Sequence, residues 1–178
     1  MLFRSTGEFL DYSKQKGNKT FGLEICEESC DILRKKGHHA YRFPGEITDT
    51  FDIITAFDVV EHLYDPYDFF SSVHKMLNPN GYLIILTGNP TSRPAKFSKE
   101  KWWYYNYPEH VVFPSPKFFK NIQGFELKSQ LDTYASKAHE PGNIILKMKE
   151  CAVKIINSNY NGLPAFAPDH QFVILQKK

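Results

Sequence analysis

The sequence predicts an α/β fold built on a mostly parallel sheet. The main evidence is the stretch from Phe51 to Thr87, in which an apolar run, an amphipathic run and a second apolar run follow one another. The first run, Phe51 to Phe57, is short and β-branched, as expected of a strand buried on both faces. A strand, a helix and a second parallel strand form a right-handed crossover. We therefore expect the end of the first strand, Ala56 to His62, at the sheet edge where such folds bind ligands.

The helix of this stretch is predicted from Pro66 to Leu77. The preceding Asp65 supplies an N-cap, and a proline suits the first helical turn. Apolar residues recur three and four positions apart and give the helix one apolar stripe, made of Phe69, Phe70, Val73, Met76 and Leu77. We expect Gly81, which follows Asn80, to end the helix and lead into the strand from Tyr82 to Leu86.

Helices and strands alternate in the same way before residue 51. The predicted elements are a helix at Glu8–Lys16 with Phe9, Leu10 and Tyr12 inward, a strand at Thr20–Leu23, a helix at Glu27–Lys36 and a strand at Ala40–Phe43. Glu24 stands directly after the first of these strands. His38 and His39 follow Gly37 and are interpreted as a solvated turn.

The second half of the chain opens with a long connection, residues 89–116, that lacks clear periodicity. Its centre, Trp102 to Pro108, is rich in aromatic residues, and a connection of this length is more often a functional lid than filler. We expect some of the aromatic side chains to be buried and others to line a pocket. The elements predicted after it are a helix at Pro116–Ile122 capped by Ser115, a strand at Phe125–Thr133, a helix over Ile144–Ile156 and a final strand at Gln171–Leu175.

Length and composition restrict the classes of function. A chain of 178 residues suits a single domain, and 22 basic against 20 acidic side chains leave a charge of +2, far from the field of a nucleic-acid binder. No apolar run is long enough for a membrane span, and the first residues lack a signal-peptide core. We expect a cytoplasmic protein without nucleic-acid or membrane partners.

The three cysteines form no even framework for disulfides. Cys26 and Cys30 lie four residues apart, but no second ligand pair is near them in the sequence. We therefore assign no metal ligands.

Five short motifs stand in a fixed order along most of the chain. They are Phe51-Asp52-Ile53-Ile54, Asp58 to Leu63, Leu77 to Leu83, Glu109-His110-Val111 with Phe113, and Gly124 to Leu127. In order and spacing they resemble the class I S-adenosylmethionine-dependent methyltransferases, in the small-molecule branch that includes the ubiquinone-biosynthesis O-methyltransferases. The resemblance implies a Rossmann-like sheet with strand order 3-2-1-4-5-7-6, in which strand 7 is antiparallel, and S-adenosylmethionine as the cofactor.

The resemblance also implies which residues hold the cofactor. Glu24, at a strand end, would accept hydrogen bonds from the two ribose hydroxyls, and Gly7 matches the last glycine of the cofactor-binding turn. Ala56, Phe57 and Asp58 would lie beside the methionine or adenosine part of the cofactor, at the point where the strand order reverses.

The start of the chain departs from the family. Upstream of Gly7 the family has a central strand, an acidic residue and two more glycines, whereas this chain has only Met1 to Ser5. The first strand is therefore expected to be short or missing. The chain is interpreted either as a truncated form of a longer protein or as one that has lost part of the site. In either case we expect marginal stability or self-association of the isolated chain.

Two histidines are candidates for the chemistry of methyl transfer. Transfer from a sulfonium is an in-line displacement that mainly needs alignment, and a base is required only if the nucleophile must lose a proton. His110 follows the aromatic connection and is the better placed to meet the substrate, with a packed histidine as the alternative. For His62, at a strand-to-helix junction, we favour hydrogen bonding to the backbone over a catalytic role.

The resemblance gives the leading hypothesis for the function, which is methyl transfer from S-adenosylmethionine to a small molecule with oxygen as the favoured acceptor atom. Sugar or polysaccharide precursors and quinone-like phenols are the candidate acceptors. The first alternative is a truncated or non-catalytic methyltransferase-fold domain that binds a partner. The second is a nucleotide-cofactor oxidoreductase, because Glu24 would also suit a nicotinamide ribose, although the sequence contains nothing that resembles a hydride-transfer site.

Overall fold

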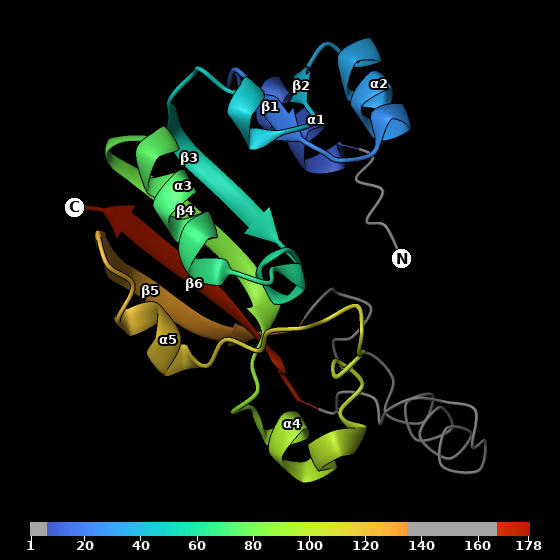
Figure 1. The fold of residues 1–178 in the computed structure, drawn as a ribbon, viewed down its shortest axis with the longest axis vertical. Coiled ribbons are helices and arrows are strands. Elements are labelled where there is room, and N and C mark those ends of the chain that lie inside the picture. The colour runs from blue at the N-terminus through green and yellow to red at the C-terminus, as the bar shows by residue number, and fades with distance from the viewer. Residues whose placement is uncertain (1–6, 135–166) are drawn as a thin grey trace. The chain divides into compact units, whose positions relative to one another are not determined.

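The computed structural model describes residues 7–134 and 167–178 (Figure 1). The chain forms two compact units, residues 1–49 and 50–178, and each unit is described by itself. Two expectations from the sequence, the first strand within Met1 to Ser5 and the helix over Ile144–Ile156, lie outside the described residues.

The first unit alternates helices and strands as predicted. Its elements are α1 (Glu8–Gln15), β1 (Phe21–Leu23), α2 (Glu27–Lys35), β2 (His39–Tyr41) and the 3₁₀ helix η1 (Pro44–Glu46). β1 and β2 pair in parallel, with Gly22 opposite Ala40. The buried Leu33 of α2 packs over this glycine, because a Cβ at Gly22 would come within 2.6 Å of Leu33 Cδ1. The close approach of helix and strand therefore requires glycine in β1.

Two predictions about side chains of the first unit are wrong. Phe9 and Tyr12, expected to face inward from α1, are 50% and 58% exposed. His38, expected in a solvated turn, is buried, with its Nδ1 2.7 Å from Thr20 Oγ1 and its Nε2 2.9 Å from Asp11 Oδ1. These hydrogen bonds link the residues before β2 to α1 and to the start of β1.

The second unit is built on a four-stranded sheet (Figure 1). Its strands are β3 (Phe51–Phe57), β4 (Leu77–Gly88), β5 (Phe125–Thr133) and β6 (His170–Lys177), in the order β3-β4-β6-β5. β3 and β4 are parallel, whereas β6 is antiparallel to both β4 and β5. This order is the 4-5-7-6 part of the predicted sheet and the β1–β2 pair is its 3-2 part, so the Rossmann-like fold is confirmed. β3 is not buried along its whole length, since Ile53 is 57% exposed.

The core of the second unit lies between one face of this sheet and two helices, α3 (Pro66–Met76) and α5 (Pro116–Lys120). The predicted stripe of α3 is confirmed, because Phe70 and Val73 are buried and Phe69 and Met76 pack beside them. Phe70 meets Phe125 of β5 edge-on, with ring centroids 6.2 Å apart. The aromatic contact joins α3 to the far strand of the sheet.

The two helix starts differ in their capping. Asp65 caps α3 as predicted, since its Oδ1 accepts hydrogen bonds from the amides of Tyr67 and Asp68 at 2.9 and 3.1 Å. Ser115 stands at the N-cap of α5, but its side chain makes no capping hydrogen bond, so the predicted cap is wrong in this respect. A proline at the first helical position is common to both helices.

The turn between α3 and β4 also differs from the prediction. α3 leads directly into β4, and the residue with positive φ is Asn80, at 63°, rather than Gly81. Glycine is required at position 81 for another reason. A Cβ there would lie 2.9 Å from the carbonyl oxygen of Asn78 and 3.2 Å from that of Asp52. The glycine thus allows the backbones of β4 and β3 to approach each other.

The connection between β4 and α5 carries a short helix, α4 (Arg93–Ser98), and a 3₁₀ helix, η3 (Lys99–Lys101), that the sequence analysis does not predict. Trp102 and Tyr104 are buried here and form a small cluster with Ala95, whereas Tyr107 is exposed. The expected burial of part of the aromatic segment is therefore confirmed. None of the helices within residues 7–134 and 167–178 is long and apolar enough to cross a membrane.

Candidate active site

The candidate site lies at the carboxyl end of β3, in the second unit. Ala56 is buried there and pairs with Ile85 of β4, and Phe57 and Asp58 follow it. The amide of Asp58 donates to the carbonyl of Leu86 at 2.9 Å. Asp58 has a φ of 51°, in the left-handed region that residues other than glycine seldom adopt. Strain of this kind concentrates at functional sites.

One oxygen of the Asp58 carboxyl group is not satisfied by the residues that the structure describes. Its Oδ1 is buried and has no hydrogen-bond partner among the described residues. Burial raises the pKa of Asp58 to about 6, and the negative charge of Glu61 adds to the effect, while His170 and His62 oppose it. A buried polar atom without a partner costs about 1–3 kcal/mol, so this oxygen is a place where a bound group can gain binding energy.

Glu61 lies on the next turn, the 3₁₀ helix η2 (Val60–His62), and is fully buried. Its Oε2 accepts a hydrogen bond from Thr87 Oγ1 of β4 at 2.8 Å, and its carbonyl accepts from the amides of Val111 and Val112. Its Oε1 is buried without a hydrogen-bond partner in the described part of the chain and lies 4.0 Å from His62 Nε2. The sequence analysis did not select Glu61, although a carboxylate between Val60 and His62 in an apolar stretch is a usable signal.

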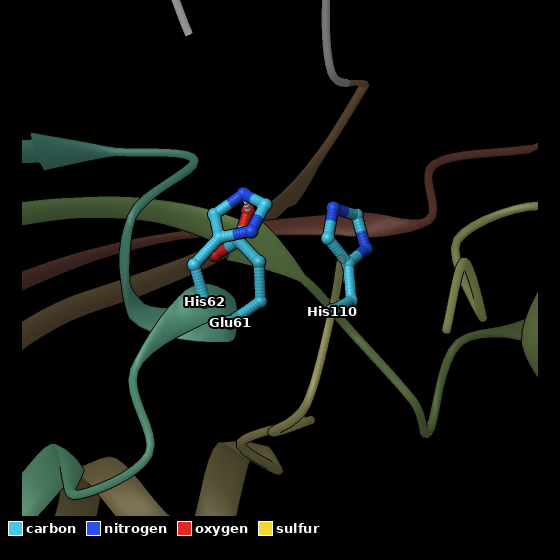
Figure 2. Close-up of side chains that lie close together, drawn as sticks. All are labelled: Glu61, His62 and His110. Atoms are coloured by element: carbon cyan, nitrogen blue, oxygen red, sulfur yellow. Dashed lines mark ion pairs between the residues drawn. The ribbon is translucent and has the colours of Figure 1, made fainter. Parts of the chain in front are cut away.

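His62 and His110 are brought together by the fold, as Figure 2 shows. Their rings meet edge-on with centroids 4.7 Å apart. His62 Nδ1 donates to the carbonyl of Glu109 at 2.7 Å, and His110 Nδ1 donates to the carbonyl of Tyr104 at 2.7 Å. A carbonyl can only accept, so in both neutral imidazoles Nε2 carries the lone pair. Backbone hydrogen bonding of His62 is therefore confirmed.

The same cluster could hold a metal ion. Glu61, His62 and His110 each offer one ligand atom, and these atoms lie within 4.8 Å of one another. Imidazole nitrogens with a carboxylate oxygen suit divalent transition metals, and three protein ligands leave a position open for a substrate. The sequence analysis assigns no metal ligands, because the spacing of these residues along the chain follows no ligand motif.

Tyr104 joins this cluster to β4. Its ring lies against Gly88, where a Cβ would come within 2.2 Å of Tyr104 Cε1, so only glycine fits. Its hydroxyl lies 3.4 Å from Thr87 Oγ1, and burial together with the charge of Glu61 raises the pKa of Tyr104. The phenol therefore stays protonated. The ring also contacts the imidazole of His110, with centroids 4.3 Å apart.

A further imidazole–carboxylate pair lies at the start of β6. Asp169 and His170 are buried, and His170 Nδ1 donates to Asp169 Oδ1 at 2.9 Å. The other oxygen of Asp169 accepts from the indole nitrogens of Trp102 and Trp103 at 3.1 and 2.7 Å. Burial by itself raises the pKa of Asp169, but the hydrogen bonds from His170 and the two indoles lower it overall. The sequence analysis missed both residues, whose signal is a charged pair directly before an apolar strand.

The two cofactor candidates of the first unit lie where the sequence analysis expects them. Gly7 precedes α1 with a φ of 75°, and a Cβ there would come within 2.4 Å of Leu33 Cδ2. Glu24 follows β1, its amide donates to the carbonyl of Tyr41 at 2.9 Å, and its Oε1 accepts from the amide of Cys26 at 3.4 Å. Their contact with a cofactor stays a prediction.

The strand order matches the fold of solved S-adenosylmethionine-dependent methyltransferases. A structure of this class from Mesorhizobium loti matches with a TM-score of 0.64 and 15% identity, over 99% of this chain and 88% of that chain. A second, from Archaeoglobus fulgidus, matches with a TM-score of 0.59 and 19% identity, over 97% of this chain and 82% of that chain. At such identities the matches show the fold.

The sequence comparison shows the family. Residues 5–127 match the methyltransferase domain family, and the chain belongs to that family. The ubiquinone biosynthesis O-methyltransferases of Caulobacter vibrioides and of Caulobacter sp. strain K31 are 28% and 29% identical to it over 87 residues. That stretch is 49% of this chain and 34% of each relative, so the match spans about a third of their length. The predicted methyltransferase family is thus confirmed.

Proposed function

We propose that this chain binds S-adenosylmethionine and transfers its methyl group to an oxygen atom of a small molecule, with a quinone-like phenol as the acceptor. The observation that carries the proposal is the cluster of Glu61, His62 and His110, in which acid–base side chains converge beyond the carboxyl end of β3 (Figure 2). Ligands of open α/β sheets bind at this edge.

Transfer to a hydroxyl group needs alignment of the reacting atoms and removal of one proton. S-adenosylmethionine, when bound, supplies a methyl group on a sulfur that leaves readily. The residues of the chain have to orient the acceptor and receive its proton. His110 is fixed by its hydrogen bond to the carbonyl of Tyr104, so its Nε2 can accept a hydrogen bond from the acceptor hydroxyl.

The surroundings of His110 support a phenol over a sugar. Tyr104 contacts the imidazole directly, and Trp102, Tyr105 and Phe113 pack around that tyrosine and one another. Aromatic side chains favour a planar ring, whereas a sugar needs several hydrogen-bonding groups for orientation. The names of the two Caulobacter relatives support the same acceptor class.

The proposal is tested by incubating the chain with methyl-labelled S-adenosylmethionine and either protocatechuate, as a catechol, or glucose. Transfer of label to the catechol, with a product that has gained one methyl group, is the expected result. Binding of S-adenosylmethionine without transfer to any hydroxyl compound would support the non-catalytic alternative instead.

His110→Gln is expected to lower turnover while sparing the affinity for S-adenosylmethionine, because the side chain acts on the acceptor. Turnover with protocatechuate and the Kd from calorimetry are the two measurements, with His39→Gln on the exposed part of the first unit as the matched control. If cofactor binding collapses and Tm falls with it, His110 is a packing residue and the acceptor contact is refuted.

A second candidate is the same transfer assisted by a divalent cation, which the spacing of Glu61, His62 and His110 favours. Such a cation would orient the two oxygens of a catechol and stabilise the oxyanion. Loss of turnover in EDTA with recovery in Mn²⁺ or Zn²⁺, at unchanged affinity for S-adenosylmethionine, is the expected signature. Full turnover after chelation would exclude this version of the site.

A further inference from the structure

We propose that His170, held by Asp169, is the base that takes the proton of the acceptor hydroxyl during methyl transfer. The inference rests on the methyl-transfer function proposed above and names a residue that no sequence motif marks. The step balances as follows: the acceptor oxygen forms the C–O bond, the C–S bond breaks with its electron pair leaving on sulfur, and the hydroxyl proton moves to His170 Nε2.

Asp169 fixes the tautomer of His170. The distance from His170 Nδ1 to Asp169 Oδ1 is 2.9 Å, and an ionised carboxylate only accepts, so Nδ1 carries the hydrogen. Nε2 therefore presents a lone pair. The carboxylate also stabilises the imidazolium that forms when Nε2 takes up a proton, which is the role of the aspartate in hydrolase triads. Trp102 and Trp103 hold Asp169 in place through its second oxygen.

The lone pair of His170 is unused within the part of the chain that the structure describes. The residue is 1% exposed, and its Nε2 is buried without a hydrogen-bond partner among residues 7–134 and 167–178. Few buried polar atoms of native structures are left in this state, and each calls for an explanation. Oδ1 of Asp58 is in the same state, and His170, where it is protonated, lowers the pKa of that carboxyl group. A hydroxyl group of a bound acceptor would satisfy Nε2 by donating to it.

His170 is also better suited as a base than the two histidines that the sequence selects. His62 and His110 donate their Nδ1 hydrogens to backbone carbonyls, of Glu109 and Tyr104, which carry no net charge. A carboxylate stabilises a protonated imidazole more strongly than a neutral carbonyl does. Burial moreover lowers the pKa of His110. These two imidazoles are therefore left to position the acceptor or a cation.

The groups around His170 add little competing charge. Its cross-strand neighbours are Gly88 on β4 and Thr133 on β5, and neither titrates. Trp103 and Tyr104 pack on the imidazole from the aromatic connection, with centroids 5.7 and 4.8 Å away, and the phenol is protonated as described above. The charged groups that interact with His170 include Asp169, through its hydrogen bond, and Asp58.

The experiment compares His170→Gln and His110→Gln with two acceptors, protocatechuate and the more acidic 4-nitrocatechol, which is already ionised at neutral pH. His170→Gln is expected to lower kcat for protocatechuate by on the order of 100-fold, the scale of a lost general base, while leaving the Kd for S-adenosylmethionine unchanged. Its defect should shrink toward wild-type rates with 4-nitrocatechol, because that acceptor needs no base. A purely structural role would lower both rates equally and would refute the proposal.

The pH profile gives a second readout. The pH profile of wild-type kcat for protocatechuate should show a rising limb, as expected of a general base. His170→Gln should lack this limb and His110→Gln should keep it. If His170→Gln fails to fold, ¹⁵N NMR of the wild-type imidazole decides. A signal showing that Nε2 carries no hydrogen at neutral pH supports His170 as the base. A signal showing a hydrogen on Nε2 at neutral pH overturns the proposal. A wild-type chain that methylates neither catechol would refute the proposed function. A fully active His170→Gln chain would refute only the role of His170 as the base.

Discussion

Asp58 combines backbone strain, with a φ of 51°, and a carboxyl group that burial shifts to a pKa of about 6. The folded pKa is higher than the unfolded one, so the folded chain binds an extra proton between about pH 4 and pH 6. The resulting stabilisation is fully present below that window and is lost as pH rises through it.

Asp58→Asn is therefore expected to remove this pH dependence and to be more stable than wild type above pH 6, by on the order of 1–3 kcal/mol. Urea unfolding at pH 4, 5, 6 and 7, roughly spanning the window, measures the difference. Asp68→Asn, at an exposed carboxylate of α3, is the matched control. Parallel stability curves for wild type and Asp58→Asn would contradict the proposed burial of the charge.

Glu24→Ala is expected to weaken S-adenosylmethionine binding by about 1.5–3 kcal/mol, the scale of a charged hydrogen bond lost to a ribose. Calorimetric titration of the variant measures the loss, and Glu28→Ala, on the exposed first turn of α2, serves as the control. Unchanged affinity in a folded Glu24→Ala chain would remove Glu24 from the cofactor site.

The residues of the candidate site divide into those that a motif marks and those that only the fold assembles. Asp58, His62 and His110 lie in motifs of the family, and the sequence predicts the place of Asp58 and His62 at the carboxyl end of β3 without the structure. Asp169 and His170 begin the last strand, and nothing nearby in the sequence indicates that two indoles from residues 102 and 103 will bury them. Contacts across such separations depend on tertiary packing, which local pattern does not contain.

At the scale of elements, Gly88 at the end of β4 determines how the aromatic connection packs. The ring of Tyr104 occupies the space of a Cβ, with atoms as close as 2.2 Å to that position, and the ring is buried and cannot retreat. Gly88→Ala should therefore displace Tyr104 and destabilise the second unit by about 1–3 kcal/mol.

Chemical denaturation of Gly88→Ala measures this effect, with turnover as a second readout because Tyr104 also holds His110. Gly45→Ala is the matched control, since a Cβ at Gly45 would meet nothing within 4 Å, and it should change stability by less than about 0.5 kcal/mol. Equal stability of Gly88→Ala and wild type would mean that β4 and the connection can separate.

Elements with a strong period were predicted correctly, whereas the short helix of the aromatic connection was not. β3, α3 and β5 have the expected bounds to within a residue or two, because apolar spacing determines them. α4 has six residues, too few for a helical period, and was missed. The same limit explains the error at Gly81, where the close approach of two backbones, not a helix end, requires glycine.

For the whole molecule, the sheet order is the property that the sequence predicted best. The two-stranded sheet β1-β2 and the four-stranded sheet β3-β4-β6-β5 both have the predicted order. That order follows from the crossover rule and from the family motifs together. The proposed activity depends on which cofactor the chain binds. The prediction for the whole molecule therefore concerns how a bound cofactor changes the stability of the chain.

S-adenosylmethionine at about 100 times its Kd should stabilise the folded chain by about 2.7 kcal/mol, because it binds the folded state alone. For a chain of this length that corresponds to a rise in Tm of roughly 5–10 °C. Differential scanning fluorimetry with S-adenosylmethionine, S-adenosylhomocysteine and NAD⁺ measures the shift for each ligand. The two sulfur compounds should raise Tm and NAD⁺ should not, and Glu24→Ala should lose most of the rise. A shift with NAD⁺ alone would favour the oxidoreductase, and no shift with any of the three would leave the chain a methyltransferase fold that binds some other partner.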